Sequence, residues 1–137
     1  LLGKGPGEAI AKEGALKIKE VSYIHAEGYS TSSLKHGPFA LLKKDFPVIL
    51  LCGDDEYLSK NINAYEEINS RNANVIKIIS SHSHSDSNEK NIIVPHNSSF
   101  SYLLMVIVLQ LLSYETAISK NINPDKPRNL AKVVTVE

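Results

Sequence analysis

Three short apolar runs, each separated from the next by a longer polar or amphipathic segment, constrain the fold of this chain most. Residues 46–52, 75–79 and 92–95 are apolar at nearly every consecutive position. Such runs are typical of parallel strands that are buried on both faces. Strands that alternate with helices predict a parallel sheet covered by helices on both faces, that is, a three-layer αβα sandwich of the α/β class, flavodoxin-like in outline.

The intervening segments carry helical periodicity. Residues 8–25 have an apolar stripe at Ala11, Ala15 and Ile18, which Val21 extends, and Gly28 is a plausible stop. Asp54 is a candidate cap for a second helix that reaches residue 71. The buried side of that second helix is expected to consist of Leu58, Ile62, Tyr65 and Ile68.

A third helix is expected over residues 99–120. Its greasiest stretch, residues 103–112, is interrupted by Gln110 and is shorter than the roughly 20 residues that cross a membrane, so we interpret it as a buried helix. Residues 1–120 then form one domain and residues 121–137 form a tail. The opening Leu1-Leu2-Gly3 resembles the end of a strand, so we expect a truncated first strand in a natural chain that extends further.

Charge and cysteine content exclude several kinds of function. The formal net charge of the 137 residues is +0, which argues against a nucleic-acid surface or an anionic membrane surface. The single cysteine, Cys52, lies in an apolar run, so we expect a buried side chain and a reducing, cytoplasmic location. His82, His84 and Asp86 alternate, but their Ser-rich loop lacks supporting ligands, and we predict no metal site and no cofactor.

Three groups of residues could carry chemistry. Glu13, Lys17 and Glu20 fall at i, i+4 and i+7 of the first helix, which places two carboxylates and an ammonium group on one stripe. His36 lies beside a Gly-Pro turn, and Lys132 lies in the tail. Each has a plainer alternative: a solvated helix face, a loop histidine without a role, and a loose terminus.

Three motifs together resemble one enzyme family. Residues 13–27, residues 34–38 (Leu-Lys-His-Gly-Pro) and residues 127–137, which begin with Pro-Arg-Asn-Leu-Ala-Lys, resemble, in order, signatures of the carboxy-terminal sugar isomerase (SIS) domain of glucosamine-fructose-6-phosphate aminotransferases. Residues 109–114 resemble its last helix. By this resemblance the chain is the second SIS subdomain with the family's tail, and is inactive on its own.

The resemblance also implies roles for the candidate residues. The family makes glucosamine 6-phosphate from fructose 6-phosphate and glutamine. Lys132 would form a Schiff base with the open-chain sugar, and Glu20 would move a proton between its first two carbons, with Lys17 and Glu13 assisting. His36 would open the sugar ring in a neighbouring subunit's site, which implies a homodimer. The glutaminase domain and the first SIS subdomain, which binds the sugar phosphate, would lie elsewhere in the polypeptide.

Two departures from the family pattern are visible. Ser32-Ser33 stands where the family has Gly-Glu before its histidine motif, and Lys4-Gly5 stands where it has Arg-Gly. Two alternatives remain beside the aminotransferase: another SIS-type sugar-phosphate isomerase, and a non-catalytic module that binds a sugar phosphate or dimerises.

Overall fold

A parallel five-stranded sheet forms the centre of the molecule. The computed structural model describes residues 1–81 and 90–130. The strands are β1 (Leu2–Gly3), β2 (Tyr29–Ser30), β3 (Pro47–Cys52), β4 (Asn74–Ser81) and β5 (Asn91–Pro95). Their order across the sheet is β2-β1-β3-β4-β5, and every pairing is parallel. The predicted α/β class is confirmed.

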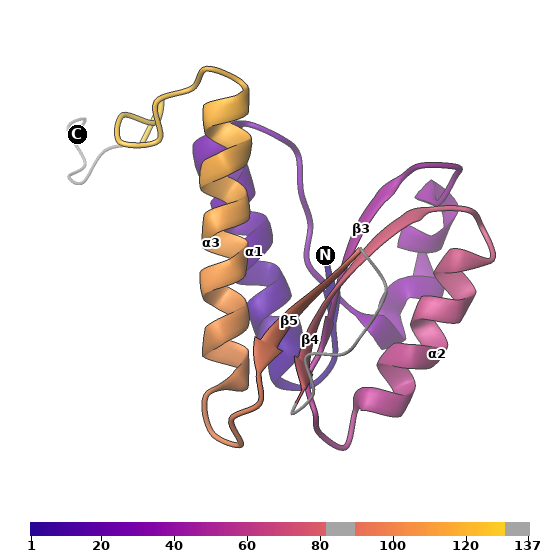
Figure 1. Cartoon of the computed structure of the whole chain (residues 1–137). Helices are drawn as coiled ribbons and strands as arrows, with labels where there is room; N and C mark the ends of the chain where they lie inside the picture. Colours follow the sequence, from indigo (N-terminus) through magenta and orange to yellow (C-terminus); the bar gives the residue numbers. More distant parts are fainter. Residues whose placement is uncertain (82–89, 131–137) are drawn as a thin grey trace, which may run out of the picture.

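Helices cover both faces of this sheet (Figure 1). One face carries α1 (Pro6–Ser22) and α3 (Ser101–Ser119), and the other carries α2 (Leu58–Asn69) with two 3-10 turns, η1 (Thr31–His36) and η2 (Pro38–Leu41). Each face has its own apolar cluster. Leu50 packs with Ile68 of α2 on one side, whereas Leu51 packs with Ala11 of α1 and Leu109 of α3 on the other. This division explains why β3 is apolar at consecutive positions.

The two helices on the α1 face lie unusually close together at Gly14. A Cβ atom at this position would lie 2.5 Å from Cδ1 of Leu109, a side chain that is only 1% exposed. Glycine therefore allows the two helices to approach here, although it costs helix propensity. Farther along, the ammonium group of Lys120 donates a hydrogen bond to the carbonyl of Ser22 (2.6 Å).

The ends of the first two helices differ from prediction. α1 ends at Ser22 rather than at residue 25, because Tyr23 adopts the left-handed conformation (φ 57°) and its N–H closes the helix onto Lys19. Asp54 does not cap α2, which begins only at Leu58, after a turn in which the Asp55 carboxylate accepts the N–H of Tyr57 (2.8 Å).

The prediction of which residues form the buried side of α2 is also partly wrong. Asn61, Ala64 and Ile68 are its buried residues, whereas Ile62 is 39% exposed. Asn61 is buried because its side-chain amide donates to the carbonyl of Leu51 (3.1 Å), so a polar residue occupies the core with its hydrogen bond satisfied.

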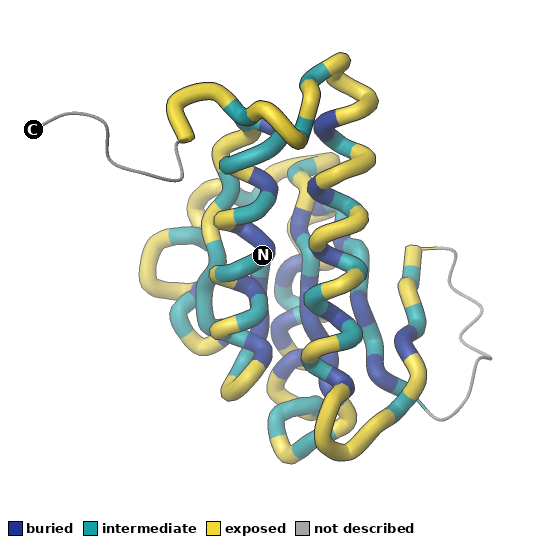
Figure 2. The backbone as a smooth tube through the Cα atoms, turned by 90° about the vertical axis from the view of Figure 1, so that its left-hand side faces the viewer, coloured by how far each residue is buried: buried dark blue, intermediate teal, exposed yellow. Residues whose placement is uncertain are grey.

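α3 is buried along one side only, which corrects the expectation of a buried helix. In Figure 2, α3 is the helix at the right that faces the viewer, and exposed positions recur along it. By length and composition, α3 is the one helix in the described part of the chain that could cross a membrane. Its most apolar stretch is 28% buried, and core helices of soluble proteins can have the same length and composition.

Candidate functional site

The predicted row on α1 forms as a pair of ion pairs around one ammonium group. The Lys17 Nζ atom lies 2.8 Å from Oε2 of Glu20 and 3.5 Å from Oε1 of Glu13. The side chains are 34%, 28% and 42% exposed for Lys17, Glu20 and Glu13. Glu20 is thus the most covered of the three, and water or a small ligand can still reach it.

The charge state of Lys17 is fixed by its neighbour. The hydrogen bond to Glu20 raises the pKa of Lys17 above its ordinary value, and the nearby charges of both carboxylates act in the same direction. Lys17 therefore stays protonated at neutral pH. The Lys17 ammonium group thus lies against the Glu20 carboxylate, a type of group that serves as a general base.

The described end of the tail lies against the same helix. The backbone N–H of Arg128 donates to the hydroxyl of Tyr23 (2.7 Å), and its guanidinium group stacks 4.2 Å from the centre of that ring. Beyond this anchor, Leu130 reaches the hollow that Glu20 lines. The hollow measures about 370 Å³, and its lining residues are Leu16, Lys19, Glu20, Tyr23, Arg128, Asn129 and Leu130.

Lys132 follows Leu130 by two positions and lies outside the described residues. Its predicted role stays a prediction. The structure does bring the predicted motif that contains it, through Arg128 and Leu130, to Glu20. The plain alternative of a tail without contacts does not hold for residues 128–130.

His36 lies on the other layer of the molecule. It ends η1, where its neighbour Lys35 pairs with Glu67 of α2 (2.7 Å) and Leu34 is buried in the cluster beneath α2. The His36 side chain is exposed and is followed by Gly37 with φ 142°. The structure therefore does not bring His36 together with Glu20 within one chain.

The two departures from the family pattern contact each other. The Lys4 ammonium group donates a hydrogen bond to the Ser32 hydroxyl. One substituted position thus partners the other, and Ser32 provides an uncharged oxygen at the start of η1, where the family pattern has Gly-Glu.

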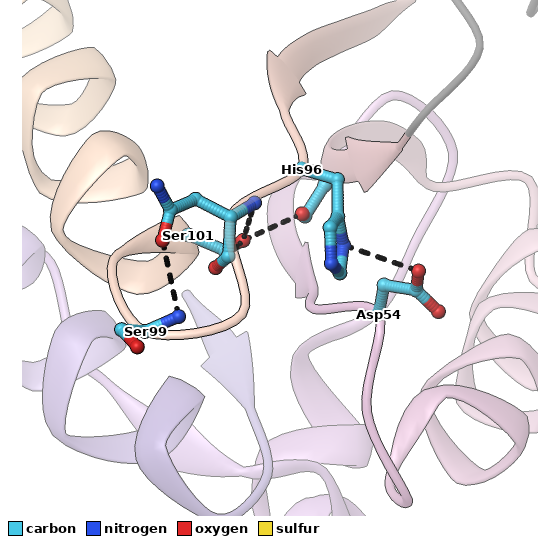
Figure 3. A network of polar contacts seen from close by, with 6 residues as sticks. Asp54, His96, Ser99 and Ser101 are labelled. Atoms are coloured by element: carbon cyan, nitrogen blue, oxygen red, sulfur yellow. Dashed lines mark hydrogen bonds and ion pairs between the residues drawn. The ribbon is translucent and has the colours of Figure 1, made fainter.

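A second polar cluster lies at the carboxyl ends of β3 and β5, and it was missed in the sequence analysis. His96 and Asp54 face each other (Figure 3), and the His96 Nδ1 atom lies 3.2 Å from a carboxylate oxygen of Asp54. Nearby, the hydroxyl of Tyr102 donates to Asp55 (2.5 Å), and burial together with this bond raises the pKa of Tyr102. The available signal was position, because ligands of open parallel sheets bind beyond the carboxyl ends of strands.

The other candidates from the sequence are Cys52 and the residues considered for a metal site. Cys52 is fully buried, as predicted, and burial raises the pKa of its thiol to about 12. Among the described residues no three His, Cys, Asp or Glu side chains could hold a metal ion together. His82, His84 and Asp86 lie outside the described residues.

Comparison with known proteins supports one family. The family model of the SIS domain matches residues 1–120. A probable glutamine–fructose-6-phosphate aminotransferase (isomerizing) of Acanthamoeba polyphaga mimivirus is 56% identical over 137 residues, and one from Shewanella oneidensis is 48% identical over 139. These matches cover 100% and 99% of this chain but only 23% of each relative.

Solved structures agree with the sequence relatives. The C-terminal domain of glucosamine-fructose-6-phosphate aminotransferase from Francisella tularensis superposes with a TM-score of 0.80 at 37% identity, over 91% of this chain and 36% of that one. A glucosamine-6-phosphate deaminase from Thermotoga maritima gives a TM-score of 0.75 at 31% identity, over 97% of this chain and 39% of that one.

Proposed function

The chain belongs to the SIS domain family, and from that premise we propose that it forms the second SIS unit of an enzyme that makes glucosamine 6-phosphate from fructose 6-phosphate and glutamine. The single observation that carries this proposal is the approach of residues 128–130 to Glu20. It supports a site in which the tail supplies an amine and α1 supplies a carboxylate.

In this site each residue has a distinct role. The Lys132 amine forms a Schiff base with the open-chain sugar, and the Glu20 carboxylate transfers a proton between the first two sugar carbons. Lys17, which Glu20 and Glu13 keep charged, assists at the same site together with Glu13. These assignments follow the family resemblance, and the geometry of the α1 row supports them.

His36 acts in the site of a second subunit, so the working enzyme is a homodimer. The supporting observation is that η1 lies on the α2 face of the sheet, away from the α1 row, so His36 needs another subunit's site. The proposed enzyme also needs the rest of its polypeptide for ammonia release and phosphate binding. We place it in the cytoplasm; the support is that the single cysteine of this chain, Cys52, is a buried free thiol.

The test uses a chimera in which this chain replaces the matching 23% of the mimivirus relative. Fructose 6-phosphate is added, the imine is reduced with borohydride, and peptide mass spectrometry locates the sugar. We expect the adduct on Lys132 and its loss in Lys132→Arg. Lys126→Arg is the matched control, because it alters another tail lysine and should keep the adduct. A folded, sugar-binding chimera without an adduct on Lys132 would rule out the Schiff-base role.

A further inference from the structure

Tyr23 ends α1 in a backbone conformation that tyrosine rarely adopts. Its φ of 57° lies in the left-handed region, where the Cβ atom crowds the backbone. Glycine and asparagine enter this region more easily and are the usual residues at such helix ends. The other described non-glycine residues with a positive φ are all asparagine or aspartate: Asp45, Asn72, Asn121 and Asn129. The helix end alone therefore does not explain a tyrosine at position 23.

The Tyr23 side chain makes two contacts with one residue of the tail. Its hydroxyl accepts the backbone N–H of Arg128 (2.7 Å), and the guanidinium carbon of Arg128 lies 4.2 Å from the centre of its ring. Asparagine or glycine could form neither the ring contact nor this hydrogen bond to a hydroxyl. We name the two contacts together the tail anchor. They give the tyrosine a use that offsets the cost of its backbone conformation.

The backbone that carries Tyr23 is also held in place. The Lys120 ammonium group, at the end of α3, donates to the carbonyl of Ser22 (2.6 Å), and the N–H of Tyr23 donates to the carbonyl of Lys19 (3.2 Å). A cation at this end of α1 is favoured by the helix dipole. α1 and α3 end on the same side of the molecule, where the described tail begins (Figure 1). The tail anchor is thus built on contacts with both helices.

The tail anchor limits how far the tail lysine can lie from it. Lys132 follows Arg128 by four positions, and an extended chain spans at most about 3.6 Å per residue, so their Cα atoms are at most about 14 Å apart. Toward the amino terminus, the nearest helical residue is Ser119, which gives a tether about three times as long. Leu130 already lines the hollow beside Glu20. The shorter tether therefore starts next to the carboxylate of the proposed site.

We propose that Tyr23 is a positioning residue, which binds Arg128 and thereby sets the reach of the Lys132 amine toward Glu20. This inference rests on the proposed function and adds to it a residue that acts through Arg128 rather than on the sugar. A shorter tether raises the local concentration of the amine at the sugar carbonyl. Loss of the tail anchor should therefore slow imine formation and leave sugar affinity nearly unchanged.

The test uses the mimivirus chimera and removes the tail anchor from either side. Tyr23→Asn keeps a residue suited to the left-handed turn but loses the ring, and Arg128→Ala loses the guanidinium group. Arg71→Ala is the matched control, because it removes an arginine from the ring of Phe39 (5.1 Å) on the α2 face. All three should melt within about 3 °C of the unsubstituted chimera, since such exposed contacts stabilise a fold only slightly.

Borohydride trapping is followed over time at several concentrations of fructose 6-phosphate. At saturating sugar we expect the trapping rate on Lys132 to fall about 10-fold in Tyr23→Asn and to fall clearly in Arg128→Ala, because a hydrogen bond and a cation–ring contact together shift an equilibrium by about that factor. The sugar concentration that gives half the maximal rate should change less than about twofold. Tyr23→Phe, which keeps the ring, should lie between the unsubstituted chimera and Tyr23→Asn.

Trypsin provides a readout that needs no sugar. It cleaves after Arg128, whereas Pro127 hinders cleavage after Lys126. Release of the tail in Tyr23→Asn should speed cleavage of the Arg128–Asn129 bond about 10-fold, because proteolysis follows the population of the released form. Mass spectrometry of brief digests measures this rate.

The outcomes separate this inference from the proposed function. Equal trapping rates in Tyr23→Asn and the unsubstituted chimera would overturn the positioning role, even if trypsin cleavage became faster. So would a loss in Arg71→Ala as large as that in Arg128→Ala. An unsubstituted chimera without an adduct on Lys132 would instead refute the proposed function, and this inference with it.

Discussion

The side chains of Glu20 and Cys52 differ in how far solvent can reach them. The Glu20 side chain is 28% exposed and lies 2.8 Å from an ammonium group, so a substrate can reach it. The Cys52 thiol is fully buried, and its pKa of about 12 keeps it protonated. A nucleophilic thiol needs the opposite environment, partly exposed and electropositive. Of the two environments, that of the α1 row is therefore the one that fits the proposed site.

Glu20→Gln should separate catalysis from stability. Its ion pair with Lys17 is partly solvated, so we expect the free energy of unfolding of the isolated chain to change by less than about 1 kcal/mol. Production of glucosamine 6-phosphate by the chimera should fall by about 100-fold or more, since a general base contributes on that order. Glu8→Gln, which removes the α1 ion pair with Lys12, is the control. Equal losses in the two variants would show that Glu20 has no special role.

Cys52 should make stability fall at alkaline pH. The thiol has a raised pKa when folded, so its contribution is complete below its unfolded pKa of 9.0 and is lost as pH rises toward about 12. At pH 10 we expect a loss of about 1 kcal/mol relative to pH 8, beyond any loss in Cys52→Ala. Urea unfolding of both proteins at the two pH values measures this. Parallel pH profiles would contradict the assignment, as would rapid thiol labelling of the native chain.

Among the secondary-structure elements, the long or strongly apolar ones were predictable and the short ones were not. The strands that became β3, β4 and β5 stood out as apolar runs, and α1 and α3 as helical segments. β2 is two residues long and has no pattern of its own; it forms because it pairs with β1, where the N–H of Tyr29 donates to the carbonyl of Leu1 (3.0 Å). Helix ends shifted because local turns, as at Tyr23, override the apolar periodicity.

The candidate site shows the same division between local and distant information. The spacing of Glu13, Lys17 and Glu20 predicted their common face, because that relation lies within one helix. The contact between Tyr23 and Arg128 joins residues 105 positions apart, and spacing cannot indicate such a contact. The Asp54–His96 pair likewise depends on which strands are neighbours in the sheet.

Gly14→Ala should destabilise the chain although alanine favours helices. The added methyl group would lie 2.5 Å from Leu109, whose buried side chain has little room to move. We expect a net loss of about 1–3 kcal/mol in urea unfolding. Combining the substitution with Leu109→Ala should give less than the sum of the two single losses, because the second change removes the clash. Additive losses would mean that the helices do not meet at Gly14.

At the scale of the whole molecule, this chain should bind fructose 6-phosphate weakly by itself. The hollow beside Glu20 is shallow, and in the proposed enzyme the phosphate-binding subdomain lies outside this chain. We expect isothermal titration of the isolated chain to show no binding below millimolar concentrations, whereas the chimera binds in the ordinary substrate range. Micromolar affinity of the isolated chain would contradict the proposal that most phosphate binding lies outside this chain.

The contact between Arg128 and Tyr23 also determines when, during synthesis of the chain, the hollow beside Glu20 can form. A ribosome makes α1 early in this chain, yet one wall of the hollow beside Glu20 is complete only when the residues 105 positions later have emerged. At synthesis rates of about 5–20 residues per second, Tyr23 precedes Arg128 by about 5 to 20 seconds. A product released early would lack the tail, so the proposed activity is expected only from chains whose translation has passed this point.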